Sequence, residues 1–163
     1  MSSSDRRAVL SFALLALGAC GFSPALAPGG SAEGLQGQIA VDAPSAVESF
    51  EFVRALEARL GRPEAPRYRL SADIVVAEES MGILPDQTIT RYSVLGEVEY
   101  RLTEIVTGRL VTSGQASNFT SYAATSTTVA TTSAQADARR RLMTILADQI
   151  VDDLYLSRRD WPA

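Results

Sequence analysis

Hydrophobic residues recur every three or four positions over residues 42–60, which is the spacing of one helix face. The expected buried face consists of five apolar residues, Val47, Phe50, Val53, Leu56 and Leu60. Pro44 suits a first helical turn, and Ser45 with Glu48 has the spacing of a capping box. Gly61 is placed to end this predicted helix. A short strand, residues 39–41, is expected before it.

The apolar period changes to two from Arg67, as in strands that are buried on one face only. The apolar positions of the first run are Tyr68, Leu70, Ala72, Ile74 and Val76. A second run covers residues 88–102, and its apolar positions are Tyr92, Val94, Val98, Tyr100 and Leu102. Between the two runs, Gly82 and Pro85 predict a loop over residues 78–87.

A third long strand is predicted from Arg109 to about Tyr122, after a turn at Thr107-Gly108. The pattern leaves its buried face open, because Val111 and Phe119 lie opposite Leu110 and Ala116. Residues 123–132 are small, polar and rich in threonine, which favours an extended mobile segment.

Ser133 is then expected to cap a long C-terminal helix. Its apolar stripe comprises Ala138, Leu142, Ile145, Leu146, Gln149, Ile150 and Leu154. Arg139, Arg140 and Arg141 are interpreted as a solvated helix face or a contact surface.

The predicted order is strand, helix, three long strands, helix. One sheet face is apolar and two amphipathic helices need partners, so both helices are expected to pack on that face. The predicted fold is a two-layer α+β sandwich with a four-stranded, mostly antiparallel, mixed sheet. The other sheet face is expected to stay polar and available.

The N-terminus predicts a lipoprotein. Arg6 and Arg7 precede a short apolar run, which suits a signal peptide but is too short to span a bilayer as a mature helix. Leu17-Gly18-Ala19-Cys20 reads as a lipobox, so Cys20 is expected to carry diacylglycerol and an N-acyl chain. The predicted parts are a signal peptide, a lipidated tether and one domain: residues 1–19, 20–38 and 39–163. Sec and twin-arginine export both remain open, and Gly21 favours the outer membrane.

Composition argues against several function classes. All 15 basic residues are arginines, and they face 19 acidic residues, so no basic stripe for nucleic acid is present. The chain has no histidine, and its one cysteine is Cys20. No catalytic triad and no metal site is therefore expected, and no cofactor beyond the lipid on Cys20. The neighbouring carboxylates Glu78-Glu79 and Asp152-Asp153 are interpreted as solvated surface, not as acid–base pairs.

Six short motifs can be compared with known families: Cys20-Gly21-Phe22-Ser23-Pro24, Tyr100-Arg101-Leu102, Thr107-Gly108, Ser121-Tyr122, Asp137-Ala138-Arg139-Arg140-Arg141-Leu142 and Leu146-Ala147-Asp148-Gln149-Ile150. Together they resemble the LptE family of lipopolysaccharide-assembly lipoproteins in its alphaproteobacterial form. The chain departs from the pattern at Ala25-Leu26-Ala27, where an aromatic residue is expected. The resemblance implies a non-enzymatic protein, lipid-anchored on the periplasmic side of the outer membrane. It also implies two partners, an LptD-type β-barrel that the protein plugs and helps to assemble, and lipopolysaccharide.

If lipopolysaccharide is a ligand, its phosphates call for arginines, because guanidinium groups bind phosphate oxygens bidentately. The candidates on the polar sheet face and its loop ends are Arg67, Arg69, Arg91, Arg101 and Arg109. The alternative is that they pair across strands with Asp73, Glu97 and Glu99. A different function class also fits a lipobox with an α/β sandwich, namely an auxiliary lipoprotein of an ABC-type lipid transporter.

Overall fold

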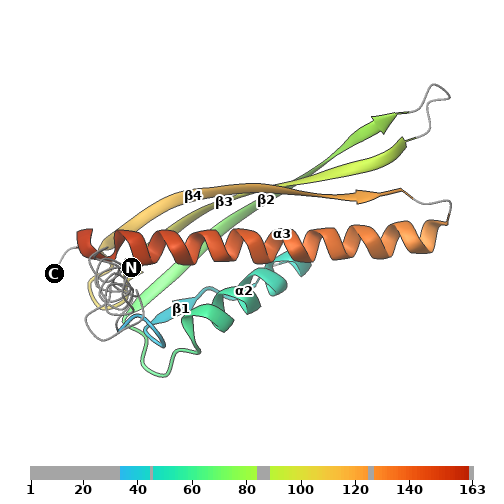
Figure 1. Cartoon of the computed structure of the whole chain (residues 1–163). Helices are drawn as coiled ribbons and strands as arrows, with labels where there is room; N and C mark the ends of the chain where they lie inside the picture. The colour runs from blue at the N-terminus through green and yellow to red at the C-terminus, as the bar shows by residue number, and fades with distance from the viewer. Residues whose placement is uncertain (1–33, 45, 84–88, 125–126, 162–163) are drawn as a thin grey trace, which may run out of the picture.

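The computed structural model describes residues 34–44, 46–83, 89–124 and 127–161. Its elements are β1 (Ile39–Val41), α2 (Val47–Leu60), β2 (Tyr68–Ile83), β3 (Ile89–Glu104), β4 (Leu110–Ala123), α3 (Thr128–Ser157) and the 3-10 turn η2 (Arg158–Asp160). The strands form one sheet in the order β1-β2-β3-β4. β1 runs parallel to β2, whereas the other neighbours are antiparallel. α3 runs along the sheet and α2 lies beside it, so the predicted α+β sandwich is confirmed (Figure 1).

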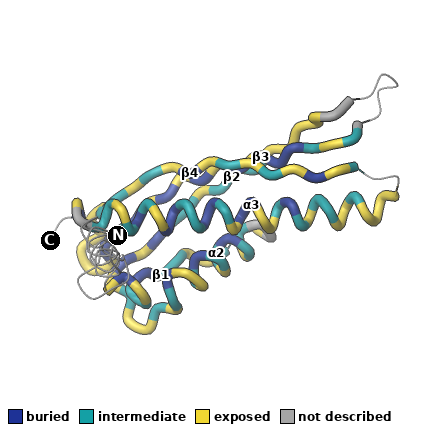
Figure 2. Tube along the Cα trace, viewed as in Figure 1, coloured by how far each residue is buried: buried dark blue, intermediate teal, exposed yellow. Residues whose placement is uncertain are grey.

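The core lies between the sheet and the two helices. Its fully buried members come from α2, the sheet and α3, and include Phe52, Leu56, Leu60, Leu70, Leu102, Leu142, Leu146 and Ile150. The buried positions form a line along α3 (Figure 2). Gly96 marks the closest approach of α3 to β3, because a Cβ atom there would lie 2.8 Å from Cδ1 of Leu146.

Helix α2 differs from the prediction at its start and in its buried face. It begins at Val47 after an N-cap at Ala46 that makes no side-chain hydrogen bond, and Ser45 lies outside the described residues. Phe50 is 62% exposed, whereas Phe52 is 1% exposed. The predicted buried face ran back from Leu56 through Val53 to Phe50 in steps of three residues. In the structure the buried aromatic residue is Phe52, four residues before Leu56. Gly61 ends the helix as expected, with a positive φ of 77°.

The β2–β3 hairpin is longer than predicted. β2 continues to Ile83, so residues 78–83 of the predicted loop are strand, and residues 84–88 lie outside the described residues. Pairing of Glu78 with Val94 and Ser80 with Tyr92 supplies the backbone partners that hold this polar stretch extended. The expected apolar positions of both strands do face the helices.

The structure decides the open question of β4. Ala116 and Tyr122 are buried, and Phe119 is 66% exposed. The register shifts between Leu102 and Thr103 of β3, which leaves one extra residue near Val111. Such a bulge exchanges the two faces of the strand at that point. This explains why the apolar residues at the start of β4 did not share a face with those in the rest of the strand.

Helix α3 begins at Thr128, so the prediction of an extended segment up to Thr132 is wrong, as is the cap at Ser133. The hydroxyls of Thr131 and Thr132 donate to backbone carbonyls four residues earlier, at 3.1 and 2.9 Å. These bonds satisfy the hydroxyls within the helix. The predicted stripe is confirmed at Ala138, Leu142, Leu146, Ile150 and Leu154, and Met143, Ala147 and Val151 are buried with it.

The packed domain begins before Ile39. Leu35 is fully buried, and the backbone N–H of Gly37 donates to the carbonyl of Leu60 at 2.8 Å. Leu35 and Gly37, which the sequence assigned to the tether, therefore pack with the domain. Cys20 lies outside the described residues.

Candidate functional site

The sheet face that points away from the helices, called the outer face below, is the candidate site. The strand register arranges its side chains in rows across β2, β3 and β4. From one end the rows are Arg69–Thr103, Ser71–Arg101–Ser113, Asp73–Glu99–Gln115, Val75–Glu97–Ser117, Ala77–Leu95–Phe119, Glu79–Ser93–Ser121 and Gly82–Arg91–Ala123. Arginine thus occurs at both ends of the outer face, with acidic and apolar rows between.

Two of the five candidate arginines belong to an ion-pair cluster at the first end. Arg67 donates to Oε1 of Glu104 through Nε at 3.0 Å and Nη2 at 2.9 Å, and Arg109 lies 3.6 Å from Oε2. Thr107 also donates to Oε2, at 2.8 Å. The hydrogen bonds from Thr107 and Arg67 lower the pKa of Glu104, although its partial burial acts the other way. The carboxylate holds the turn after β3, so Arg67 and Arg109 have structural partners.

The other three arginines are more available. Arg69 lies 3.8 Å from Oδ1 of Asp42, and both side chains are more than half exposed, so the pair is weak. Within the described part of the chain, no carboxylate lies within 4.0 Å of Arg91 or Arg101. The expected cross-strand pairs with Asp73, Glu97 and Glu99 are not formed there.

The five arginines do not converge on one point. Arg69 and Arg101 are diagonal neighbours in adjacent rows, because Ser71 pairs with Arg101 and Arg69 with Thr103. Arg91 lies ten residues from Arg101 along β3, which corresponds to about 33 Å of extended strand. The outer face therefore offers a close pair of arginines at one end and a single arginine at the other.

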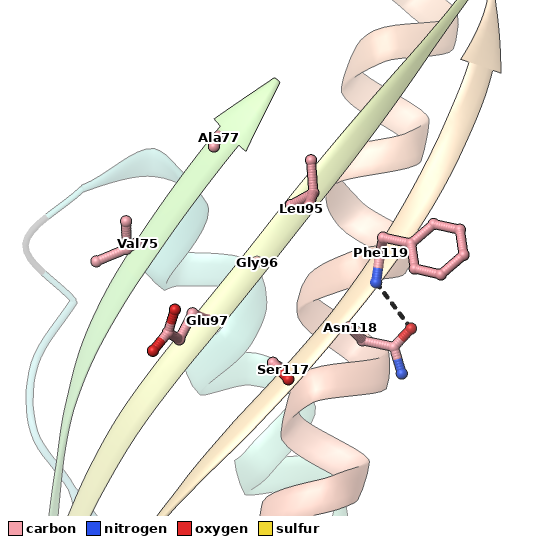
Figure 3. A pocket seen from close by; sticks show the side chains of 8 residues that line it. All are labelled: Val75, Ala77, Leu95, Gly96, Glu97, Ser117, Asn118 and Phe119. Carbon is pink, nitrogen blue, oxygen red and sulfur yellow. Dashed lines mark hydrogen bonds between the residues drawn. The ribbon is translucent and has the colours of Figure 1, made fainter. Parts of the chain in front are cut away.

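The middle of the outer face is apolar, so the prediction that this whole face is polar is wrong there. Val75, Leu95 and Phe119 are 65%, 36% and 66% exposed. With Ala77 they border an open hollow of about 570 Å³, whose other lining includes Glu97 and Ser117 (Figure 3). The available signal was their position on the polar side of each alternating run, where large apolar residues need an explanation.

A second polar group lies between the sheet and α3. Glu78 accepts hydrogen bonds from Tyr122 Oη at 2.8 Å and Gln135 Nε2 at 2.9 Å, and Arg139 Nη2 lies 3.6 Å away. Tyr122 stacks on Tyr92 with 5.2 Å between ring centroids. Glu78 lies at an exposed position, as predicted, but its carboxylate is held by Tyr122, Gln135 and Arg139.

The pKa shifts of this group follow from its contacts. Burial alone would raise the pKa of Glu78, but hydrogen bonds from Gln135 and Tyr122 and the charge of Arg139 lower it. Burial, followed by the hydrogen bond to Glu78, raises the pKa of Tyr122 to about 12. Both groups hold their ordinary charge states at neutral pH, and their partners give them a structural role.

Two further findings bear on function. Among the described residues, no cluster of three or more acidic or thiol side chains could hold a metal ion. The described helices include none that is long and apolar enough to cross a membrane.

Comparison with known families identifies the chain. Residues 37–154 match the family model of LptE, described as lipopolysaccharide-assembly. The chain belongs to the LptE family. The match spans β1 to the last turns of α3, and so includes the whole outer face. The resemblance inferred from the sequence motifs is thus confirmed.

Solved structures show the same fold. A candidate lipoprotein from Caulobacter crescentus CB15 is 20% identical with a TM-score of 0.66, over 79% of this chain and 96% of that one. The rare lipoprotein B from Shewanella oneidensis is 10% identical with a TM-score of 0.57, over 76% and 96%. A minor lipoprotein from Acinetobacter baumannii is 16% identical with a TM-score of 0.55, over 74% and 90%. No curated protein sequence matches the chain.

Proposed function

We propose that this LptE-family protein is a lipid-anchored, non-enzymatic component of an outer-membrane lipopolysaccharide-insertion complex. In this proposal it helps to assemble and plugs an LptD-type β-barrel, and it contacts lipopolysaccharide. The family match over residues 37–154 is the observation that carries the proposal. The outer face adds chemistry suited to a lipid with phosphate groups.

The proposed anchor is Cys20, the first residue after the predicted signal peptide. Diacylglycerol and an N-acyl chain there exceed the two lipid signals that stable membrane attachment requires. Replacing Cys20 by serine should remove the protein from the outer-membrane fraction, where the wild type should stay. A soluble wild-type protein would contradict the anchor.

The barrel partner is supported by the polar outline of the domain. The interior of a large outer-membrane barrel is polar, so a plug needs exposed polar side chains. Arg140 and Arg141 on α3 are about half exposed, and their ion pairs in the described part of the chain are local ones with Asp137. Arg141 also donates to the backbone carbonyl of Ser121. Two exposed arginines suit contact with the polar inner wall of a barrel.

Co-purification tests the barrel partner. The tagged protein, isolated from detergent-solubilised outer membrane, should carry a large β-barrel protein with it. Recovery of inner-membrane ABC-transporter subunits instead would favour the auxiliary-lipoprotein function and contradict this proposal. The double variant Arg140→Ala/Arg141→Ala tests the contact with the barrel wall in the same co-purification. Arg54→Ala on α2 is the control, because the side chain of Arg54 is 79% exposed.

Lipopolysaccharide contact is proposed at the outer face. Phosphate oxygens fit Arg69 and Arg101 at one end or Arg91 at the other, and acyl chains fit the apolar hollow between. Arg69→Ala and Arg91→Ala should each weaken binding of purified lipopolysaccharide while barrel association and thermal unfolding stay unchanged. Unchanged binding in both variants would contradict this part of the proposal.

A further inference from the structure

The free edge of the sheet at β4 has a part that is open to a fifth strand. β4 is an end strand in the sheet order, and its sequence from Leu110 to Ala123 contains no charged residue and no proline. Proteins usually protect such edges with charges, prolines or covering segments, because the unpaired backbone groups can bind another strand.

The outward-pointing backbone groups of β4 can be identified. The N–H of Phe119 donates to its neighbour Asn118 Oδ1 at 2.8 Å, and the carbonyl of Ser121 accepts from Arg141 Nη2 at 3.3 Å. Neither group is therefore directed at β3. Antiparallel pairing alternates, so Ser117, Gln115 and Ser113 also point their N–H and C=O groups outward.

The two halves of this edge differ. The N–H of Phe119 is already bonded to the side chain of Asn118, and the carbonyl of Ser121 to the side chain of Arg141. Beside Gln115 and Ser117, by contrast, the edge borders an open hollow of about 380 Å³. The edge is thus open beside residues 115–117, and Ser113 is the next position whose backbone groups point outward.

The wall of this hollow comes from α3 and is acidic. It is formed by Gln149, Asp152 and Asp153. In the described part of the chain, neither aspartate has an arginine within 4.0 Å, and Oε1 of Gln149 is buried without a hydrogen-bond donor. Rotation of Gln149 toward an incoming N–H group would break no hydrogen bond at that oxygen.

We propose that the edge at residues 113–117 binds an extended, positively charged peptide segment of a partner protein, which adds to the sheet as a fifth strand. Main-chain hydrogen bonds to Ser113, Gln115 and Ser117 provide affinity, and alternate side chains provide specificity. Lysine or arginine at every second position would face Asp152 and Asp153. The same aspartates disfavour a second copy of this chain, whose net charge is −4.

A peptide probe tests the proposal with the intact mature protein. The probe is acetyl-Thr-Lys-Val-Lys-Thr-Lys-Val-amide, labelled for fluorescence anisotropy. Controls are the same peptide with glutamate for lysine and the same peptide with alternate backbone nitrogens methylated. The lysine peptide should bind and should slow hydrogen exchange at Gln115 and Ser117, whereas both control peptides should bind about tenfold more weakly or not at all.

Two protein variants locate the site. Ser117→Pro removes an outward N–H without removing a bond to β3, since proline is tolerated at such edge positions. Asp152→Asn/Asp153→Asn removes the acidic wall, and Glu64→Gln/Asp160→Asn is its charge-matched control at exposed sites. Ser117→Pro and the aspartate double variant should each weaken binding about tenfold, and the control should not.

Several results would overturn the proposal. One is equal binding of the methylated peptide, because it cannot pair as a strand. Another is full binding by the aspartate double variant, a result that does not depend on whether Ser117→Pro folds. Concentration-dependent dimerisation of the protein that Ser117→Pro abolishes would assign the edge to a second copy instead. Loss of lipopolysaccharide binding has no bearing on these outcomes.

Discussion

Tyr122 Oη donates a 2.8 Å hydrogen bond to Oε1 of Glu78, and this bond joins two strands that are not neighbours in the sheet. Tyr122 lies on β4 and Glu78 on β2, so the bond passes across the helix-facing side of β3. Gln135 and Arg139 of α3 reach the same carboxylate. A single side chain therefore connects the far half of the hairpin to β4 and to the long helix.

The first prediction concerns Glu78 at acid pH. Its pKa is lowered in the folded state, so its contribution to stability is present above the ordinary value of 4.5 and is lost as pH falls below it. Glu78→Gln should lower the free energy of unfolding at neutral pH by about 0.5–1 kcal/mol, because a hydrogen-bonded charge is lost at a position where solvent screens it. Urea unfolding between neutral pH and about pH 3 should show a smaller loss for the variant than for wild type. Glu79→Gln, at an exposed position, is the control; equal acid sensitivity of Glu78→Gln and wild type would contradict the assignment.

The second prediction concerns Tyr122 at alkaline pH. Its pKa is raised from 10.0 to about 12, so its contribution to stability is complete below pH 10 and is lost as pH rises toward 12. In ultraviolet titration of the folded protein, wild type should have one more tyrosine that ionises well above pH 10 than Tyr122→Phe has. The stability of that variant should fall less steeply above pH 10. Tyr92→Phe provides the comparison, and an unchanged titration curve in Tyr122→Phe would refute the prediction.

The third prediction uses two phenylalanines of the same helix. Phe52 is 1% exposed and Phe50 is 62% exposed. Phe52→Ala should cost about 3–5 kcal/mol of unfolding free energy, because it leaves a cavity in the core. Phe50→Ala should stay within about 0.5 kcal/mol of wild type. Chemical denaturation of both variants measures the difference, and a larger loss for Phe50→Ala than for Phe52→Ala would mean that the helix has the rotation expected from the sequence.

This pair of residues shows how far the pattern could lead. Period-two and period-three-to-four patterns predicted every strand and helix, because burial of one face dominates each element. At about 100° per residue, Phe52 lies about 40° from Leu56 around the helix axis and Phe50 about 120° from it. The helical period therefore favours Phe52, and the prediction missed it because it followed steps of three residues back from Leu56.

The candidate site was harder to predict than the fold. The ten residues between Arg91 and Arg101 on one predicted strand already separated those two arginines, whereas only the strand register brings Arg101 beside Arg69. Glu104 was not considered, although it is the partner of Arg67 and Arg109. The contacts of Glu104 depend on the turn after β3, and no local pattern encodes them.

The fourth prediction tests close packing within the sheet. A Cβ atom on Gly114 would lie 2.7 Å from Oη and 2.9 Å from two ring carbons of Tyr100. Because Tyr100 is 4% exposed, its rigid ring has little space to move. Gly114→Ala should therefore destabilise the protein by about 1–3 kcal/mol, whereas the exposed neighbour Ser113→Ala should be nearly neutral. Thermal unfolding compares the two, and a stabilised Gly114→Ala would show that the ring can shift freely.

The fifth prediction separates function from stability at the apolar hollow. Phe119 and Val75 lie more than half exposed on the outer face, so Phe119→Ser and Val75→Ser remove little buried apolar area. Both variants should unfold within about 0.5 kcal/mol of wild type, yet bind purified lipopolysaccharide more weakly. Val129→Ser is the matched control, because Val129 is 79% exposed on α3. If the hollow receives acyl chains, deacylated lipopolysaccharide should bind wild type and Phe119→Ser equally. Equal binding of intact lipopolysaccharide by Phe119→Ser, Val75→Ser and wild type would instead limit any lipid contact to the arginine ends of the outer face.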